Sequence, residues 1–114
     1  MLSQKHRLSK SADVKKTTAR GRSFFNPYFV IKTGPNPKVA LVTVVVSVRV
    51  SKKAVERNRI KRVMRDELRK HITRFKPGNY AFLVKTSVMK ITSAQLREEI
   101  NKSLTNAKIL NPNN

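Results

Sequence analysis

The chain has 114 residues, a length that fits one domain, and its 26 Lys and Arg residues against 6 Asp and Glu residues give a formal net charge of +20. This charge attracts polyanions from a distance, so nucleic acid is the first candidate partner and an anionic membrane surface the second. The absence of cysteine excludes disulfides, thiolate metal sites and a cysteine nucleophile, and the longest apolar stretch, near residues 39–48, is too short to span a bilayer.

The first part of the chain is polar and basic. Residues 1–8 predict a polar tail, and serines near position 10 can cap a helix over about residues 9–20, which Gly21 is well placed to end. Three β-branched residues lower the intrinsic helix propensity of this segment, so it needs tertiary packing; they are Val14, Thr17 and Thr18. The basic composition of residues 1–23, with its serines and threonines, also resembles a mitochondrial transit peptide, which leaves that alternative open.

Two apolar segments in the first half of the chain predict β-strands. The aromatic and β-branched residues from Ser23 to Lys32 indicate strand, and Pro27 marks an edge or a break within it. The Gly-Pro-Asn-Pro sequence at residues 34–37 predicts a turn. Residues 39–48 are almost all β-branched, so we expect the central strand of the sheet here, covered on both faces.

The second half predicts a long helix and then a strand. The helix spans about residues 51–74, the Lys-Pro-Gly-Asn sequence at residues 76–79 ends it, and residues 80–84 predict the strand. With a last helix, the order α-β-β-β-α-β-α predicts an α+β fold, a two-layer α/β sandwich whose mixed sheet has one face less covered than the other. We expect residues 9–110 to form this single α/β domain and residues 111–114 a short tail.

The last helix has clear start and face signals. Thr92 and Gln95 can form a capping box, and Ile91 before the cap can pack on the following turn as a hydrophobic staple. Apolar residues at four-residue spacing then give the helix one apolar face; they are Leu96, Ile100 and Leu104.

The long helix separates into faces on a helical wheel of about 100° per residue. One sector of about 120° on this wheel holds the core positions Ile60, Met64, Leu68 and Ile72. Polar residues at spacings of 4, 3 and 4 make one continuous row beside it, called the basic row below; its members are Asn58, Arg62, Arg65 and Arg69. Arg57 and Lys61 lie at the edge of the core sector, where long stems cover apolar neighbours, and Arg59 lies farther round on the solvent side.

Two interpretations of this positive charge compete. The ordinary one is a solvated amphipathic helix whose charges serve solubility. Solubility needs mixed charges, whereas this helix is overwhelmingly positive, and Asp66 and Glu67 soften the repulsion only slightly. Planar guanidinium groups match phosphate oxygens with bidentate donors. The basic row therefore predicts binding to a sugar-phosphate backbone.

The acids and histidines do not predict catalysis by this chain. A nuclease that uses two metals needs several converging carboxylates, and no group of the six acids has the spacing of a metal site. Glu98 and Glu99 lie on the surface of the last helix, where we expect them to be solvated. His6 and His71 give no reason to expect that they converge for acid–base cleavage of RNA. The inventory indicates a binding protein.

Aromatic side chains can stack on unpaired bases, although strand aromatics usually belong to the core. Tyr28 and Tyr80 are the better candidates for an open sheet face, because each has a polar end.

Residues 54–66 read Ala-Val-Glu-Arg-Asn-Arg-Ile-Lys-Arg-Val-Met-Arg-Asp. This run resembles the signature of the bacterial ribonuclease P protein subunit, Ala-Val-x-Arg-Asn-x-x-Lys-Arg-x-x-Arg-Glu, with Asp66 in place of the Glu. Further agreement lies in Arg7-Leu8, in Asp13 and in the Gly-Arg-Ser sequence at residues 21–23. With the element order, the resemblance covers about residues 6–105.

The resemblance implies a protein that joins a large catalytic RNA. The ribonucleoprotein cuts precursor tRNA and releases the 5′ leader, and the RNA holds the active-site metals. Mg²⁺ is then expected through RNA phosphates and not on protein carboxylates, with no catalytic residue in this chain. The family fold resembles a ribosomal-protein domain with a left-handed β-α-β crossover through the arginine-rich helix. A cytoplasmic location is expected, with no membrane and no obligate protein partner.

The resemblance also assigns two sets of contacts by position. Contacts to the catalytic RNA fall on the matched residues and their neighbours in the row: Arg57, Asn58, Arg59, Lys61, Arg62, Arg65 and Arg69. The leader lies in a cleft between the first helix and the sheet, where the candidates are Val14, Thr17, Thr18, Tyr28, Phe29 and Ile31. The family usually has phenylalanines on the first helix, so this chain is expected to rely more on Phe29, Ile31 or backbone.

Three other functions stay open. A ribosomal or general RNA-binding protein needs the charge but not the ordered motif. A double-stranded DNA-binding protein would be distinguished by competition at fixed salt. A free protein nuclease would require RNA cleavage by protein that carries no RNA.

Overall fold

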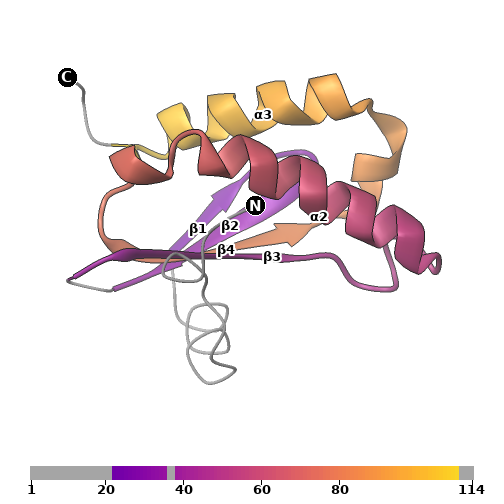
Figure 1. Cartoon of the computed structure of the whole chain (residues 1–114), viewed down its shortest axis with the longest axis horizontal. Helices are drawn as coiled ribbons and strands as arrows, with labels where there is room; N and C mark the ends of the chain where they lie inside the picture. The colour runs from indigo at the N-terminus through magenta and orange to yellow at the C-terminus, as the bar shows by residue number, and fades with distance from the viewer. Residues whose placement is uncertain (1–21, 36–37, 111–114) are drawn as a thin grey trace.

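A computed structural model describes residues 22–35 and 38–110. The elements in chain order are β1 (Arg22–Phe25), β2 (Phe29–Gly34), β3 (Ala40–Val45), α2 (Ala54–Arg69), the 3-10 turn η2 (Ile72–Arg74), β4 (Gly78–Val84), the 3-10 turn η3 (Thr86–Lys90) and α3 (Ser93–Asn106). Figure 1 shows α2 and α3 side by side on one face of a four-stranded sheet, which confirms the predicted α+β sandwich. The predicted helix at about residues 9–20, with Val14, Thr17 and Thr18, lies outside the described residues.

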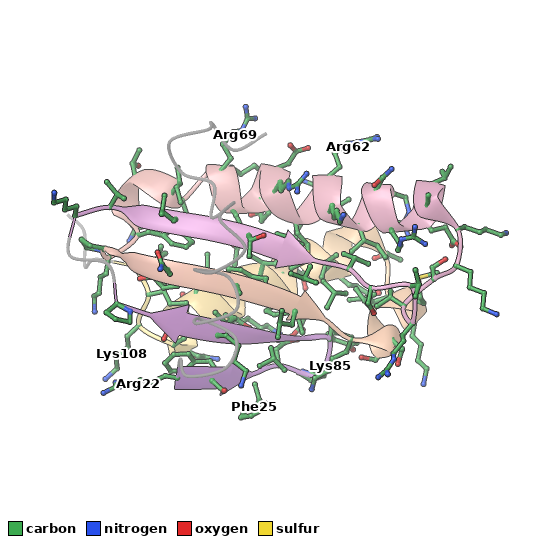
Figure 2. The ribbon with its side chains drawn as sticks, turned by 90° about the horizontal axis from the view of Figure 1, so that it is seen from below. Arg22, Phe25, Arg62, Arg69, Lys85 and Lys108 are labelled. Atoms are coloured by element: carbon green, nitrogen blue, oxygen red, sulfur yellow. The ribbon has the colours of Figure 1, made fainter. Side chains whose placement is uncertain are left out.

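The sheet has the strand order β1-β2-β4-β3. β2 pairs with β1 and with β4 in antiparallel fashion, and β3 pairs with β4 in parallel. In Figure 2 both parallel strands run to the right, with the helices behind them. Because the chain passes from β3 behind the sheet through α2 and returns as β4 below β3, this crossover is left-handed.

The core lies between the sheet and the two helices. Across the strands, Ile31 is paired with Phe82, and Phe82 with Val44; all three side chains are buried. The two helices and the turn η2 cover them with the predicted apolar positions, which are all buried: Ile60, Met64, Leu68, Ile72, Leu96, Ile100 and Leu104. Full burial of one such side chain contributes about 1.5–3 kcal/mol. The two apolar faces therefore fix which side of each helix is left for solvent.

The predicted central strand is an edge strand in the described sheet. β3 ends at Val45, and only β4 pairs with it among the described residues. Its side chains alternate between buried and less buried, and Val45 and Val48 are 37% and 64% exposed. The expectation of a central strand covered on both faces was therefore wrong. A β-branched run shows strand propensity, but it does not show which strands will pair with it or what will cover its faces.

The long basic helix is shorter than predicted. α2 starts at Ala54 and ends at Arg69, and a separate 3-10 turn at Ile72–Arg74 follows it. The strand expected at residues 80–84 starts earlier, at Gly78. Terminal turns of a helix lack full intrahelical hydrogen bonding, so their ends depend on contacts that the sequence pattern does not show.

The cap of α3 matches the prediction. The backbone N–H of Gln95 donates to Thr92 Oγ1 at 3.1 Å, and the N–H of Thr92 donates to Gln95 Oε1 at 2.9 Å. Ile91 packs against the same core cluster that contains Leu96. At the other end, Lys108 has φ 55°, and the N–H of Ile109 donates to Leu104 O at 3.2 Å, which closes the helix. Within the described ranges no helix is long and apolar enough to cross a membrane.

Candidate nucleic-acid interface

The basic row occupies the side of α2 that faces away from α3. Arg65 is half-buried, and the other three members, Asn58, Arg62 and Arg69, are exposed. Figure 2 shows Arg62 and Arg69 projecting from α2 beyond the β3 edge of the sheet. From residue 58 to residue 69 the row is about 16 Å long, at 1.5 Å per residue. A surface of this length can contact more than one phosphate of a nucleic-acid strand.

The donors of the row are available to a ligand. Within the described part of the chain, the structure shows no hydrogen bond or ion pair for any of its four side chains. Behind the row, Ile60, Met64 and Leu68 are at most 1% exposed and hold the helix against the core. A firmly packed helix therefore presents guanidinium groups that have no internal partner among these residues.

Two of the other predicted contacts have internal partners. Arg57 Nη1 donates to Ser51 O at 2.8 Å, and Ser51 Oγ donates to Glu56 Oε1 at 2.9 Å, so Arg57 shapes the loop that leads into α2. Arg59 Nη1 donates to Ser93 Oγ on α3 at 3.2 Å. Lys61 is half-buried, as its position at the edge of the core sector predicted. The motif thus combines residues that bind within the protein with residues that face outward.

On the opposite side of α2, Glu67 is buried between the helices and is 5% exposed. Its Oε1 lies 3.2 Å from Lys70 Nζ and 3.7 Å from Arg97 Nη1. Its Oε2 accepts a hydrogen bond from Asn101 Nδ2 at 3.0 Å and lies 3.7 Å from His71 Nε2. Burial raises the pKa of Glu67, but the hydrogen bonds from Asn101 and Lys70 and the nearby charges outweigh it, so the pKa lies below the ordinary 4.5. From the sequence we expected Glu67 only to reduce slightly the repulsion among the positive charges of the helix. Its partners on α3 are 30 or more residues away, so the sequence pattern did not reveal them.

Two predicted cleft residues are inaccessible. Phe29 and Ile31 are 0% exposed and point into the core beneath α2 and α3, so neither offers a surface to a ligand, contrary to the expectation. Tyr80, expected on an open face, is also buried, and its hydroxyl donates to Lys76 O at 2.6 Å. Tyr28 is half-buried and packs against the core.

The other face of the sheet carries residues that the sequence did not single out. Phe25 is 78% exposed on β1, and the register places Val30, Leu83 and Val45 in one row with it across the strands. Figure 2, which looks onto this face, shows Phe25 at the β1 edge. Lys32, two residues on from Val30, donates to Ser23 Oγ. No strand of the described sheet contains an acid. Once Phe29 is known to be buried, the alternation of side chains along the strand identifies this face, but the sequence alone does not show that burial.

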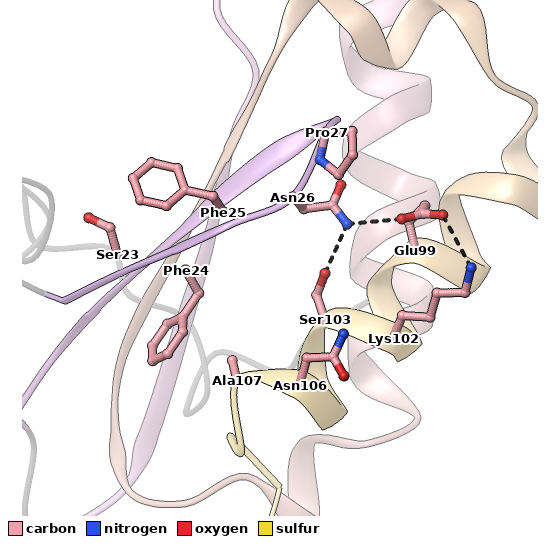
Figure 3. Close-up of a pocket in the computed structure, with 10 residues that line it drawn as sticks. All are labelled: Ser23, Phe24, Phe25, Asn26, Pro27, Glu99, Lys102, Ser103, Asn106 and Ala107. Atoms are coloured by element: carbon pink, nitrogen blue, oxygen red, sulfur yellow. Dashed lines mark hydrogen bonds and ion pairs between the residues drawn. The ribbon is translucent and has the colours of Figure 1, made fainter.

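A pocket of about 540 Å³ lies between β1 and α3. Figure 3 shows Asn26, in the turn after β1, bridging to α3: its Nδ2 donates to Glu99 Oε1 and to Ser103 Oγ, each at 3.0 Å. Its Oδ1 accepts from the N–H of Tyr28 at 2.8 Å. These bonds hold the β1–β2 turn against α3. The sequence predicted that Glu99 would be solvated, whereas the structure shows its carboxylate bonded to Asn26.

Within residues 22–35 and 38–110, no group of three or more His, Cys, Asp or Glu side chains could hold a metal ion. His6 lies outside the described residues, so the predicted separation of the two histidines stays a prediction.

Known proteins with similar sequences and folds give this arrangement a context. The family model described as Ribonuclease P matches residues 2–108. The ribonuclease P protein component of Dehalococcoides mccartyi is 32% identical over 111 residues, which cover 96% of this chain and 90% of that protein. The component from a Pseudanabaena species is 32% identical over 116 residues, covering 99% of this chain and 100% of that protein.

Solved structures agree with the sequence relatives. The ribonuclease P protein of Staphylococcus aureus superposes with a TM-score of 0.85 at 26% identity, covering 93% of this chain and 98% of that one. The Thermotoga maritima protein superposes with a TM-score of 0.72 at 22% identity, covering 84% and 92%, and shows the same fold. The chain therefore belongs to the ribonuclease P protein family.

Proposed function

We propose that this chain is the RNA-binding subunit of a ribonuclease P ribonucleoprotein, in which it assists a catalytic RNA in the endonucleolytic removal of the 5′ leader from precursor tRNA. Family membership supports a role in ribonuclease P and an RNA partner. The observation that carries the molecular part is the basic row, whose guanidinium groups have no internal partner among the described residues.

The basic row binds phosphates of the catalytic RNA in this proposal. Arg62, Arg65 and Arg69 offer planar pairs of N–H donors that match phosphate oxygens, and the buried face of α2 keeps them in one line. Fixed cations beside an RNA core reduce the repulsion between its phosphates. The protein therefore lowers the Mg²⁺ concentration that the RNA needs, while the active-site ions are held by RNA phosphates.

The leader lies on the face of the sheet opposite α2 and α3. The burial of Phe29 and Ile31 moves the proposed contacts to the exposed residues of that face, with Phe25 as a stacking surface and Lys32 as a phosphate contact. Stacking on an aromatic ring contributes about 1–3 kcal/mol per base and tolerates any sequence. The proposed opposite wall, with Val14, Thr17 and Thr18, lies outside the described residues.

Cleavage chemistry belongs to the RNA in this proposal. The chain contributes affinity and placement, acts in the cytoplasm, and needs no second protein. A general RNA-binding role remains the main competitor, because the charge alone would support it.

Reconstitution with the catalytic RNA of the same organism tests the proposal. At low Mg²⁺ the protein should speed cleavage of a leader-bearing precursor, and it should favour that precursor over mature tRNA in binding. A general RNA-binding protein would bind both tRNAs equally. No gain in cleavage at any Mg²⁺ concentration would overturn the proposed function.

A further inference from the structure

The cations on the α3 side of α2 differ from those of the basic row. Lys70, just after α2, lies 3.2 Å from Glu67, and Arg97 of α3 lies 3.7 Å from the same carboxylate. Lys102, the other cation of α3, lies 3.7 Å from Glu99. Both cations of α3 therefore have an internal carboxylate, whereas Arg62, Arg65 and Arg69 have none among the described residues.

Glu67 lies on the far side of the helix from the row. It follows Arg65 by two residues, which turns it by about 200° on the helical wheel. Its other oxygen is held by Asn101, so the carboxylate is fixed at the α2–α3 contact. Because its pKa lies below the ordinary value, Glu67 stays charged at neutral pH.

A carboxylate in this position competes with RNA for two cations. Charges attract more strongly where water is partly excluded, and Glu67 is almost fully buried while Lys70 and Arg97 stay partly exposed. A phosphate that approached from the α3 side would have to compete with this carboxylate for both. On the row side, Arg62, Arg65 and Arg69 make no ion pair with a carboxylate among the described residues, so a phosphate does not have to displace one.

We propose that Glu67 is a specificity-determining residue: by holding Lys70 and Arg97 in ion pairs, it confines RNA binding to the row side of α2. This rests on the proposed function, because it takes α2 as the helix that binds RNA. By its charge alone, an acid in a basic helix would only lower the affinity for RNA. In this proposal Glu67 also determines which side of the helix binds the RNA.

The first experiment compares two arginines with the same chemistry. Binding of Arg62→Gln and Arg97→Gln to the catalytic RNA is measured across a salt series. Each phosphate contact contributes about 0.7–0.9 to the slope of log K against log salt. Arg62→Gln should flatten the slope by about that amount, and Arg97→Gln should leave it unchanged. Equal flattening by both variants would overturn the inference.

The second experiment removes an acid from two places. Glu67→Gln keeps the shape and releases both cations, so the slope should steepen by about 1–2. Glu98→Gln removes the same charge from an exposed residue of α3 that has no ion pair among the described residues, and its slope should not change. The double variant Glu67→Gln/Arg97→Gln should lose about half of the steepening.

The same variants report on specificity. Specificity is the affinity for the catalytic RNA divided by the affinity for an unrelated RNA of equal length. This ratio should fall in Glu67→Gln and should stay unchanged in Glu98→Gln. Equal behaviour of the two would contradict the inference. If thermal melting shows that Glu67→Gln does not fold, the comparison of Arg62→Gln with Arg97→Gln still tests the inference. If Arg62→Gln leaves the slope of log K against log salt unchanged, the result would instead contradict the proposed function, in which the basic row binds RNA phosphates.

Discussion

Helices α2 and α3 are built alike toward the core and differ toward solvent. Each packs on the sheet through three apolar residues at four-residue spacing, Ile60, Met64 and Leu68 in α2 and Leu96, Ile100 and Leu104 in α3, all at most 3% exposed. Yet α2 carries six Lys and Arg against three acids, and α3 carries two against two. Since α3 packs equally well with no net charge, the excess of +3 on α2 is not needed by the fold and is free to serve binding.

The likeness of the two helices can be tested by removing one core side chain from each. Leu68→Ala and Leu104→Ala should each lower the free energy of unfolding by about 2–5 kcal/mol, because both side chains are 0% exposed and leave a cavity. Denaturant unfolding measures both. A loss below 1 kcal/mol in either variant would show that the helix is not anchored as described.

The difference between the helices can be tested by removing the charges of the row. Arg62→Gln/Arg65→Gln/Arg69→Gln should weaken binding to the catalytic RNA by at least about 100-fold, since a hydrogen bond to a charged group contributes about 1.5 kcal/mol or more. Its stability should stay within about 0.5 kcal/mol, as expected for surface changes. The control Arg97→Gln/Lys102→Gln on α3 should bind nearly as tightly as wild type. A similar loss in the control would erase the distinction between the two surfaces.

The helix starts differ as well. Thr92 caps α3, whereas Lys53 at the start of α2 makes no side-chain cap. Thr92→Ala should therefore cost about 1 kcal/mol, and Lys53→Ser should cost nothing or stabilise. Thermal unfolding measures both changes. An equal cost at the two positions would mean that the capping box adds little in this chain.

The smallest expected effect concerns the acid between the helices. The pKa of Glu67 is depressed in the folded protein, so its contribution to stability is present above the unfolded value of 4.5 and is lost as pH falls through the lower folded pKa. Wild type should lose more stability than Glu67→Gln between about pH 6 and about pH 3. Parallel pH curves for the two proteins would show that the ion pairs contribute nothing to folding.

For both helices, the sequence predicts the local features but not the long-range contacts. Both apolar faces, the capping box and the basic row follow from local spacing, and the structure has them where the spacing put them. The orientation of Phe29 did not follow, because the run Phe29-Val30-Ile31 is apolar throughout and gives no alternation from which to choose a face.

Long-range partners were also beyond the sequence. Glu67 meets Asn101 across 34 residues, and Asn26 meets Glu99 across 73. The place of β3 at the edge depends on a crossover that returns β4 to the interior of the sheet. Local patterns carry no information about such pairings, so the partners of Glu67 and Glu99 were missed.

The absence of cysteine permits a direct test of which helix meets the RNA. Val55 is 81% exposed and lies seven residues before Arg62, on the row side of α2, and Thr105 is exposed on α3. A short photo-crosslinker is attached to Val55→Cys or to Thr105→Cys, and each protein is reconstituted with the catalytic RNA and irradiated. We expect strong crosslinks to the RNA from position 55 and few from position 105. Equal or stronger crosslinking from position 105 would contradict the proposal that the row side of α2 binds the RNA.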